Sequence, residues 1–165
     1  MSAAQVLFYD PGKTTGWSVF GEHGHVMSGQ GTPEAVLAET IPWVKHREPP
    51  IIGVEKTFVG KGKRASLDVT ESLGFIRGVL WCAGWRGVLY TPTKISWMSA
   101  LGLAFWEVGP EGKKVRPTDA QLEERALAHA KALVEQTLGS GQIHQAEAVC
   151  GSQVAWEKWI ESKAA

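Results

Sequence analysis

Residues 8–17 read Phe-Tyr-Asp-Pro-Gly-Lys-Thr-Thr-Gly-Trp, a pattern that joins two predicted strands through a turn. Asp10 stands at the end of the first apolar run, and glycine-punctuated polar residues lead from it into the second. Asp-Pro-Gly is also an ordinary turn signal between strands. A carboxylate on the rigid end of a strand can bind a divalent cation, however, so Asp10 is the first candidate metal ligand.

Length and composition are typical of one globular domain. The chain has 165 residues, of which 44% are hydrophobic and 21% are charged, enough to bury a core of its own. We therefore expect residues 1–165 to form a single domain. No apolar run reaches the roughly 18 residues of a membrane span, and no basic-then-apolar leader opens the sequence. These features predict a cytoplasmic protein that has no membrane partner.

The pattern of apolar runs and turn residues predicts the order of the elements. Runs at 5–9, 16–21 and 25–29 predict three short antiparallel strands. A helix is expected from Thr32 to about Arg47, because threonine followed by proline is a typical helix start. The continuous apolar run 51–54 predicts a buried parallel strand that ends at Glu55. Later segments predict helices at 65–82, 93–101, 118–138 and 144–162, a strand at 87–90 and a polar loop at 102–116.

This order predicts an α/β fold in which a mixed five-stranded sheet has helices on both faces. A right-handed crossover brings the strand of Asp10 beside the strand that ends at Glu55, so the two carboxylates would meet at one edge of the sheet. Near the C-terminus, His144 and Glu147 share one face of a predicted helix. Such a pair is commonly a solvated helix cap. The alanines around it would also allow close packing that directs both side chains toward Asp10 and Glu55.

Positive charge is distributed unevenly along a chain whose formal net charge is zero. Residues 56–64 contain no acid and four basic residues: Lys56, Lys61, Lys63 and Arg64. A local positive surface of this kind can neutralise phosphates. A solvated basic loop without a partner fits the same pattern.

Four motifs occur in order along the chain: Asp10-Pro11-Gly12 with Thr15-Gly16-Trp17, then Val54-Glu55-Lys56-Thr57-Phe58, then Leu73-Gly74-Phe75-Ile76-Arg77-Gly78-Val79, then His144-Gln145-Ala146-Glu147-Ala148. Together they resemble the RuvC family of Holliday junction resolvases, and the resemblance covers nearly the whole chain. It implies a ribonuclease H-like fold and a homodimer that acts in DNA recombination and repair. It also implies that two magnesium or manganese ions, and no organic cofactor, serve to nick two opposing strands of a four-way DNA junction.

The resemblance assigns Asp10, Glu55, His144 and Glu147 as catalytic residues and metal ligands. Asp10 corresponds to the aspartate that contacts both ions, and Glu147 stands where the family usually has the shorter aspartate. Carboxylate oxygens are the ligands that magnesium and manganese prefer, and imidazole can either bind the metal or orient a water. Two such cations about 3.5–4 Å apart neutralise the charge of a phosphodiester transition state.

The resemblance also assigns residues that would contact DNA. Phe58 resembles an aromatic residue that stacks on bases near the crossover, with core burial as the alternative, and Lys94 resembles a lysine near the scissile phosphate. The remaining expected contacts are Lys56, Lys61, Lys63 and Arg64. The family's second lysine has no clear counterpart, and Lys113, Lys114 or Arg116 could replace it. Residues 102–116 also lack the family's glycine-rich connection, a departure typical of a divergent, phage-type member.

Other functions and assemblies fit parts of the same pattern. A ribonuclease H-like nuclease that cleaves RNA or another branched DNA would use similar carboxylates. A catalytically inactive junction-binding protein would keep the basic loop and Phe58 without cleaving. An actin-like or sugar-kinase fold also opens with an aspartate and a glycine turn, but it needs two such halves and the chain is too short. The apolar run from Leu73 to Trp85 fits either a dimer helix or the core of a monomer.

Overall fold

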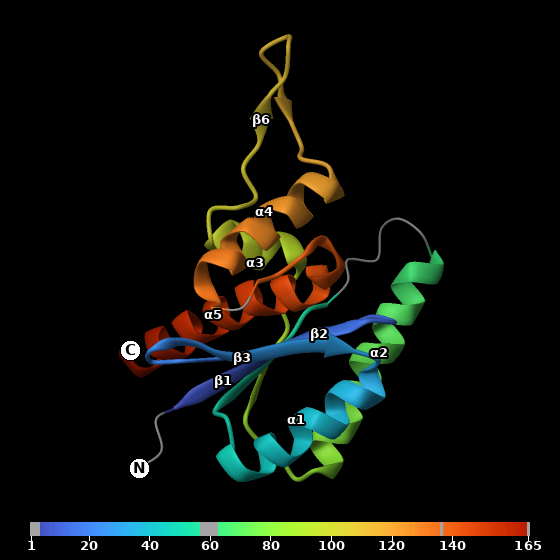
Figure 1. Ribbon diagram of the computed structural model, residues 1–165, viewed down its shortest axis with the longest axis vertical. Helices are drawn as coiled ribbons and strands as arrows, with labels where there is room; N and C mark the ends of the chain where they lie inside the picture. Colours follow the sequence, from blue (N-terminus) through green and yellow to red (C-terminus); the bar gives the residue numbers. More distant parts are fainter. Residues whose placement is uncertain (1–3, 57–62, 136, 165) are drawn as a thin grey trace.

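The computed structural model describes residues 4–56, 63–135 and 137–164. Its central sheet has five strands in the order β3-β2-β1-β4-β5 (Figure 1). The strands β1 (Gln5–Asp10), β2 (Thr15–Gly21) and β3 (Gly24–Gly31) form an antiparallel meander, and β4 (Ile51–Val54) and β5 (Val88–Tyr90) run parallel to β1. The predicted mixed five-stranded α/β sheet is therefore confirmed.

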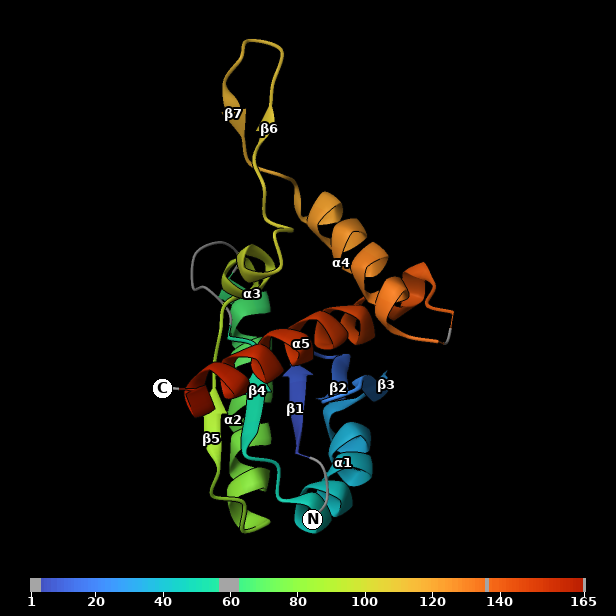
Figure 2. The ribbon, with the colours of Figure 1, turned by 90° about the vertical axis from the view of Figure 1, so that its left-hand side faces the viewer.

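Helices cover both faces of this sheet (Figure 2). On one face lie α1 (Pro33–Arg47) and α2 (Lys63–Cys82), and on the other lie α3 (Lys94–Ala100), α4 (Asp119–Leu133) and α5 (Ile143–Ala164). A short 3-10 helix, η1 (Ser140–Gln142), leads into α5. Within the described ranges, none of these helices is long and apolar enough to cross a membrane.

Side-chain alternation along β1 places Asp10 on the α5 face. Val6 and Phe8 pack in the core beneath α3, α4 and α5, whereas Leu7 and Tyr9 pack against α1 and α2. Successive side chains of a strand point to opposite faces of its sheet. Asp10 therefore shares the face of Phe8, and it is the first polar side chain at the carboxyl end of that apolar row.

The same alternation places Glu55 on the α5 face. Ile51 contributes to the core beneath α5, and Ile52 and Val54 contribute to the core beneath α1 and α2. Tyr9 of β1 pairs with Val54 of the parallel strand β4, and the backbone N–H of Glu55 donates to the carbonyl of Tyr9 (2.9 Å). The two predicted carboxylates thus lie at the carboxyl ends of neighbouring parallel strands, at one edge and on one face of the sheet.

Helix α5 lies very close to the sheet because small residues line the contact. A Cβ atom on Gly16 of β2 would lie 1.9 Å from the carbonyl oxygen of His144, and one on Gly151 would lie 2.3 Å from the ring of Phe8. Both distances are far below van der Waals contact, so any side chain at either glycine would displace the helix. The close approach fixes the first turn of α5 above the end of β1.

Two features differ from the sequence-based expectations. Helix α4 ends at Leu133 rather than near Leu138, and the prediction of a longer helix was wrong. Val134 leaves the helix with an extended backbone, but Val134 and Leu138 are both buried. The apolar residues at these positions therefore indicated burial in the core rather than helix, because an extended segment can bury them as well as a helix can.

The second difference is that residues 102–116 are not simply a polar loop. They contain a two-stranded hairpin, β6 (Glu107–Val108) and β7 (Lys114–Val115), which projects beyond α3 and α4 (Figures 1 and 2). Its turn contains Pro110, the N–H of Gly112 donates to the carbonyl of Gly109 (2.9 Å), and Gly112 has a φ of 70°. Glycine adopts this left-handed backbone readily, so the turn chemistry accounts for the hairpin.

Candidate metal centre

Three of the four predicted metal ligands converge at the carboxyl edge of the sheet. Asp10 is the last residue of β1, and His144 and Glu147 come from the first turns of α5. One ligand atom from each residue lies within 4.8 Å of the other two. The spacing of His144 and Glu147 places both on the helix face that meets β1, as the sequence predicted.

Asp10 and His144 are in direct contact. The Nδ1 atom of His144 lies 2.6 Å from Oδ2 of Asp10, a short hydrogen-bond distance. Asp10 is 5% exposed, and the imidazole of His144 is partly exposed. The pair therefore joins a buried carboxylate to a side chain that solvent, or a substrate, can reach.

Lys94 forms an ion pair with Glu147 across the helix interface. It is the first residue of α3, whose N-cap Thr93 accepts a hydrogen bond from the N–H of Ser96 (3.2 Å). Burial alone would lower the pKa of Lys94, but the ion pair with Glu147 and the charge of Glu55 raise it. Lys94 is thus a charged member of the cluster, in contact with a carboxylate rather than projecting freely into solvent.

The fourth predicted ligand, Glu55, is held by a residue that sequence reasoning missed. The indole N–H of Trp97 donates to Oε2 of Glu55 (2.7 Å), and Trp97 is fully buried. Lys94 and Trp97 are three residues apart on α3, so one face of this short helix contacts two carboxylates. This three-residue spacing was the one sequence feature that could have placed Trp97 beside Lys94 at the site. Which carboxylate the indole contacts depends on how α3 docks on the rest of the fold.

Burial of several carboxyl groups together raises their pKa values. Burial is the largest cause of the raised pKa of Asp10, and the negative charge of Glu147 adds to it. The pKa of Glu55 is raised by burial and by the charges of Asp10 and Glu147, while the hydrogen bond from Trp97 opposes the rise. The cluster therefore favours protons, or another source of positive charge, at these oxygens.

A polar network beside the cluster fixes the start of α5. The side-chain amide of Gln30 on β3 donates to the carbonyl of Gly141 (2.8 Å), and its oxygen accepts from the N–H of Gln145 (3.2 Å). The amide of Gln145 donates in turn to the hydroxyl of Ser28 (2.9 Å). These contacts hold the residues on either side of His144 against β3, and the sequence pattern did not predict them.

The structure describes only some of the residues that are predicted to contact DNA. Lys56 is exposed directly after Glu55, and its backbone N–H donates to the carbonyl of Pro92 (2.9 Å), which ties the end of β4 to the segment before α3. Phe58 and Lys61 lie outside the described residues, as do the side chains of Lys63 and Arg64. The basic loop therefore stays a sequence-based prediction.

Solved structures with a similar fold include two of RuvC from T. thermophilus. RuvC in complex with a Holliday junction substrate shares 13% sequence identity and a TM-score of 0.62, with 90% of each chain covered. A second T. thermophilus RuvC structure shares 15% identity and a TM-score of 0.62 over the same shares of the two chains. The complex of Fowlpox virus resolvase with Holliday junction DNA shares 10% identity and a TM-score of 0.51, covering 98% of this chain and 99% of that one.

The likeness lies in structure rather than in sequence. No protein-family model matches the chain, and no curated protein sequence matches it. At such low identities the comparisons establish the fold, which is the ribonuclease H-like fold of RuvC-type resolvases. The resemblance predicted from the four sequence motifs is confirmed at this level, over nearly the whole chain.

The raised pKa of Asp10 predicts a gain of stability for Asp10→Asn in the metal-free protein. The folded state holds a proton on Asp10 more tightly than the unfolded chain does, so the stability linked to this proton is lost as pH rises through the folded pKa. Asparagine does not titrate. In chelator, we therefore expect the variant to melt several degrees higher than the wild type, and we expect this gain to grow from acidic to neutral pH. A stability difference of about 1 kcal/mol corresponds to a shift in melting temperature of about 2–4 °C for a chain of this size.

Thermal unfolding followed by circular dichroism across this pH range would measure the gain. Glu39→Gln, at an exposed position of α1, is the matched control and should leave the melting temperature nearly unchanged. A gain that is constant with pH, or a destabilised Asp10→Asn protein, would contradict the prediction.

For a cluster that binds Mn²⁺ through Glu55, the contact between Trp97 and Glu55 predicts that Trp97→Phe weakens this binding. Phenylalanine keeps an aromatic ring in the core but removes the N–H that fixes Oε2 of Glu55. Loss of a hydrogen bond that orients a metal-ligating side chain typically reduces metal affinity about 10–100-fold. Titration of Mn²⁺ followed by calorimetry should show this loss. Met98→Ala removes volume from the same buried helix without a polar contact, and it should lower the melting temperature but leave Mn²⁺ affinity nearly unchanged. Equal affinities for wild type and Trp97→Phe would exclude this role.

Proposed function

We propose that this protein is a metal-dependent, structure-selective endodeoxyribonuclease that resolves four-way DNA junctions by paired nicks. The observation that carries the proposal is the convergence of Asp10, His144 and Glu147 at the carboxyl edge of a RuvC-type sheet, with Glu55 directly after the neighbouring strand β4. The two core clusters share this one sheet, which supports a single nuclease domain for residues 1–165.

The residues of the cluster suit magnesium or manganese. Asp10, Glu55 and Glu147 bring carboxylate oxygens and His144 brings an imidazole, the donor types that hard divalent cations accept. Lys94 supplies one ammonium group against three carboxyl groups, so full ionisation of the cluster would leave negative charge in excess. Cations held by Asp10, Glu55, His144 and Glu147, two of them in the proposal, would remove that excess and neutralise charge developing on the scissile phosphate.

The side chains themselves have distinct roles in this proposal. Oδ2 of Asp10 hydrogen-bonds with Nδ1 of the imidazole, which fixes the orientation of the His144 ring. The exposed part of His144 is then placed to bind a metal or to take a proton from the attacking water. Trp97 holds one oxygen of Glu55 and leaves the other for a ligand, while Lys94 limits the repulsion between Glu147 and Asp10.

Paired nicks require two active sites, and α2 supports a two-fold dimer. Along this helix Ile76 and Leu80 are buried in the monomer, but Trp81 is 65% exposed. Gly74 and Gly78 lie on the exposed side with open space where a Cβ would stand. Glycine weakens an isolated helix by about 0.5–1 kcal/mol relative to alanine, so exposed glycines beside a tryptophan suit the close approach of a second copy.

A substrate panel tests the proposed activity. Synthetic four-way junction, three-way junction, linear duplex, single-stranded DNA and RNA would each be incubated with Mg²⁺, Mn²⁺ or chelator. We expect symmetric paired nicks in the four-way junction with either metal and none with chelator. Asp10→Asn should reduce cleavage by at least about 10³-fold while it leaves junction affinity within a few-fold of the wild type, because the amide keeps the shape of the side chain and loses its charge.

The other outcomes of the panel lead to different functions. Preferential cleavage of RNA or of three-way junctions would replace the substrate class and keep the metal centre. Junction binding without cleavage in either metal would identify a catalytically inactive binding protein. Full cleavage by Asp10→Asn would remove the proposed centre altogether.

The dimer proposal predicts that Trp81→Glu separates the subunits. The substitution replaces the exposed indole with a negative charge at the centre of the proposed α2–α2 interface. Burying this charge on association would cost free energy, whereas the same charge on a free surface would stay hydrated. Sedimentation equilibrium at micromolar concentration should give twice the 17.9 kDa mass of the chain for the wild type and a monomer for the variant. Val26→Glu, at an exposed position of β3, is the control that should remain dimeric. A wild-type protein that stays monomeric on a junction would refute the paired-nick mechanism.

A further inference from the structure

The hairpin formed by β6 and β7, with its flanking residues 105–116, is an arm that extends away from the rest of the protein (Figures 1 and 2). It connects α3 to α4, so it leaves the fold directly after the helix that carries Lys94 and Trp97. An isolated two-stranded hairpin is only marginally stable in water. An arm of this kind therefore depends on the contacts at its base.

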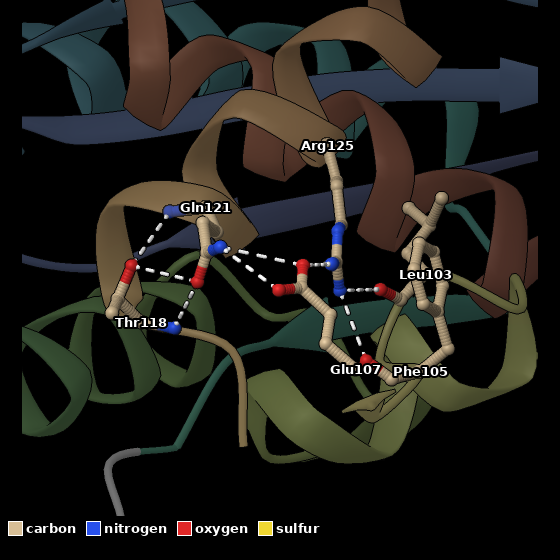
Figure 3. Close-up of polar contacts among 6 residues, drawn as sticks. All are labelled: Leu103, Phe105, Glu107, Thr118, Gln121 and Arg125. Atoms are coloured by element: carbon tan, nitrogen blue, oxygen red, sulfur yellow. Dashed lines mark hydrogen bonds and ion pairs between the residues drawn. The ribbon is translucent and has the colours of Figure 1, made fainter. Parts of the chain in front are cut away.

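Two residues of α4, Arg125 and Gln121, contact the base of the arm (Figure 3). The guanidinium of Arg125 donates to the carbonyls of Leu103 (3.2 Å) and Phe105 (3.1 Å), pairs with Glu107 (2.5 Å) and stacks on the Phe105 ring, 3.7 Å from its centroid. Gln121 adds hydrogen bonds to both oxygens of Glu107 (3.3 Å each). These contacts tie the start of the arm, residues 103–107, to α4.

Gln121 is itself fixed by the start of α4 (Figure 3). Its side-chain oxygen accepts from the N–H of Thr118 (2.7 Å), and its own N–H donates to the Thr118 hydroxyl (3.3 Å), a reciprocal capping box. The helix start and the hairpin base therefore form one polar unit.

The register of the hairpin separates an inner face from an outer face. Glu107 pairs with Val115, and Val108 pairs with Lys114. Directly paired residues of antiparallel strands point to the same side, and successive residues alternate. Glu107 belongs to the inner face, which meets Arg125, so Val108 and Lys114 belong to the outer face. Continuing the register by one pair places Trp106 and Arg116 on the outer face as well.

The outer face combines exposed aromatic and aliphatic surface with positive charge. Trp106 is 56% exposed and Val108 is 75% exposed, and Lys114 and Arg116 are exposed beside them. Both acidic residues of the arm form ion pairs with residues that are not on the outer face: Glu107 pairs with Arg125, and Glu111 pairs with Lys113 of the turn (2.8 Å). The outer face therefore presents net positive charge around an exposed indole.

We propose that this outer face binds branched DNA through a surface separate from the carboxylate cluster, with Lys114 and Arg116 on backbone phosphates and Trp106 stacked on an unpaired base at the branch. Phosphate neutralisation by lysine and arginine, combined with stacking on an aromatic ring, is how proteins hold exposed nucleic-acid strands. The inference rests on the proposed junction-resolving function and adds to it a DNA contact outside the carboxylate centre.

The arrangement of α3 explains why a contact here would matter to cleavage. Lys94 at the start of α3 touches Glu147, and the chain leaves the end of α3 to form the arm. DNA bound to the outer face would thus be held by the arm, and the arm continues from the end of α3, the helix whose first residue contacts the candidate metal ligand Glu147. The fastened base lets the arm bind without first becoming ordered, which would cost affinity.

The test compares two outer-face variants of the full chain, Trp106→Ala and the double variant Lys114→Ala/Arg116→Ala. Binding to a four-way junction and to linear duplex would be measured by fluorescence anisotropy in chelator at several salt concentrations, and cleavage with Mg²⁺ in parallel. The double variant should weaken both complexes and reduce the slope of log affinity against log salt by about 2, or about 1 for each lost phosphate contact. Trp106→Ala should weaken junction binding about 5- to 100-fold and affect linear duplex much less.

Lys45→Ala/Lys163→Ala is the matched control, because it removes two exposed lysines from α1 and the end of α5. Melting temperatures of all variants would establish that the exposed substitutions leave the fold intact. Loss of affinity confined to the outer-face variants supports the inference. If the wild type resolves junctions and those variants bind as tightly as the control, the arm inference is overturned and the proposed function stands.

Two other outcomes also overturn the inference. If the wild type neither binds nor cleaves branched DNA, the proposed function fails and the arm has no such ligand. If the outer-face variants lose junction affinity only because they no longer sediment as dimers, the outer face contacts a second copy of the chain rather than DNA.

Discussion

The candidate site depends on how closely the first turn of α5 approaches the sheet. The carbonyl oxygen of His144 lies where a side chain on Gly16 would stand, 1.9 Å from the position of its Cβ. Further along, Ser18 and Ser152 share a hydrogen bond (3.0 Å) across the same contact. Because a helix cannot move by an ångström at one end without disturbing such packing, the absence of a side chain at Gly16 sets the positions of His144 and Glu147 above Asp10.

That placement has an electrostatic cost. Asp10, Glu55 and Glu147 raise each other's energy when they are charged and buried, and one lysine offsets only part of the repulsion. Burial and repulsion of this kind destabilise a protein unless protons or cations neutralise the groups. The remainder of the fold must supply this stability, and two apolar cores, one on each face of the sheet, are available to do so.

Local sequence rules predicted the sheet and most of the side chains that meet at the candidate site, because those features depend on alternation and on the ends of strands. Asp10 and Glu55 follow apolar runs, and parallel neighbours end at the same edge. The hairpin was not predicted, since strands of two residues are too short to give a periodic signal, although Gly109-Pro110-Glu111-Gly112 is a strong turn sequence. The contact of Trp97 with Glu55 depends on how α3 docks, which no local pattern contains.

Helix α3 consequently links features that lie far apart in the sequence. Through Lys94 it contacts Glu147 on α5, through Trp97 it contacts Glu55 after β4, and from its end the chain enters the arm that Arg125 fastens to α4. Glutamate at position 147 has one methylene more than aspartate, and this reach allows one carboxylate to lie near Asp10 and to pair with Lys94. A shift of α3 would therefore alter two carboxylates together, so the geometry of the carboxylates and the position of the arm are coupled through seven residues of helix.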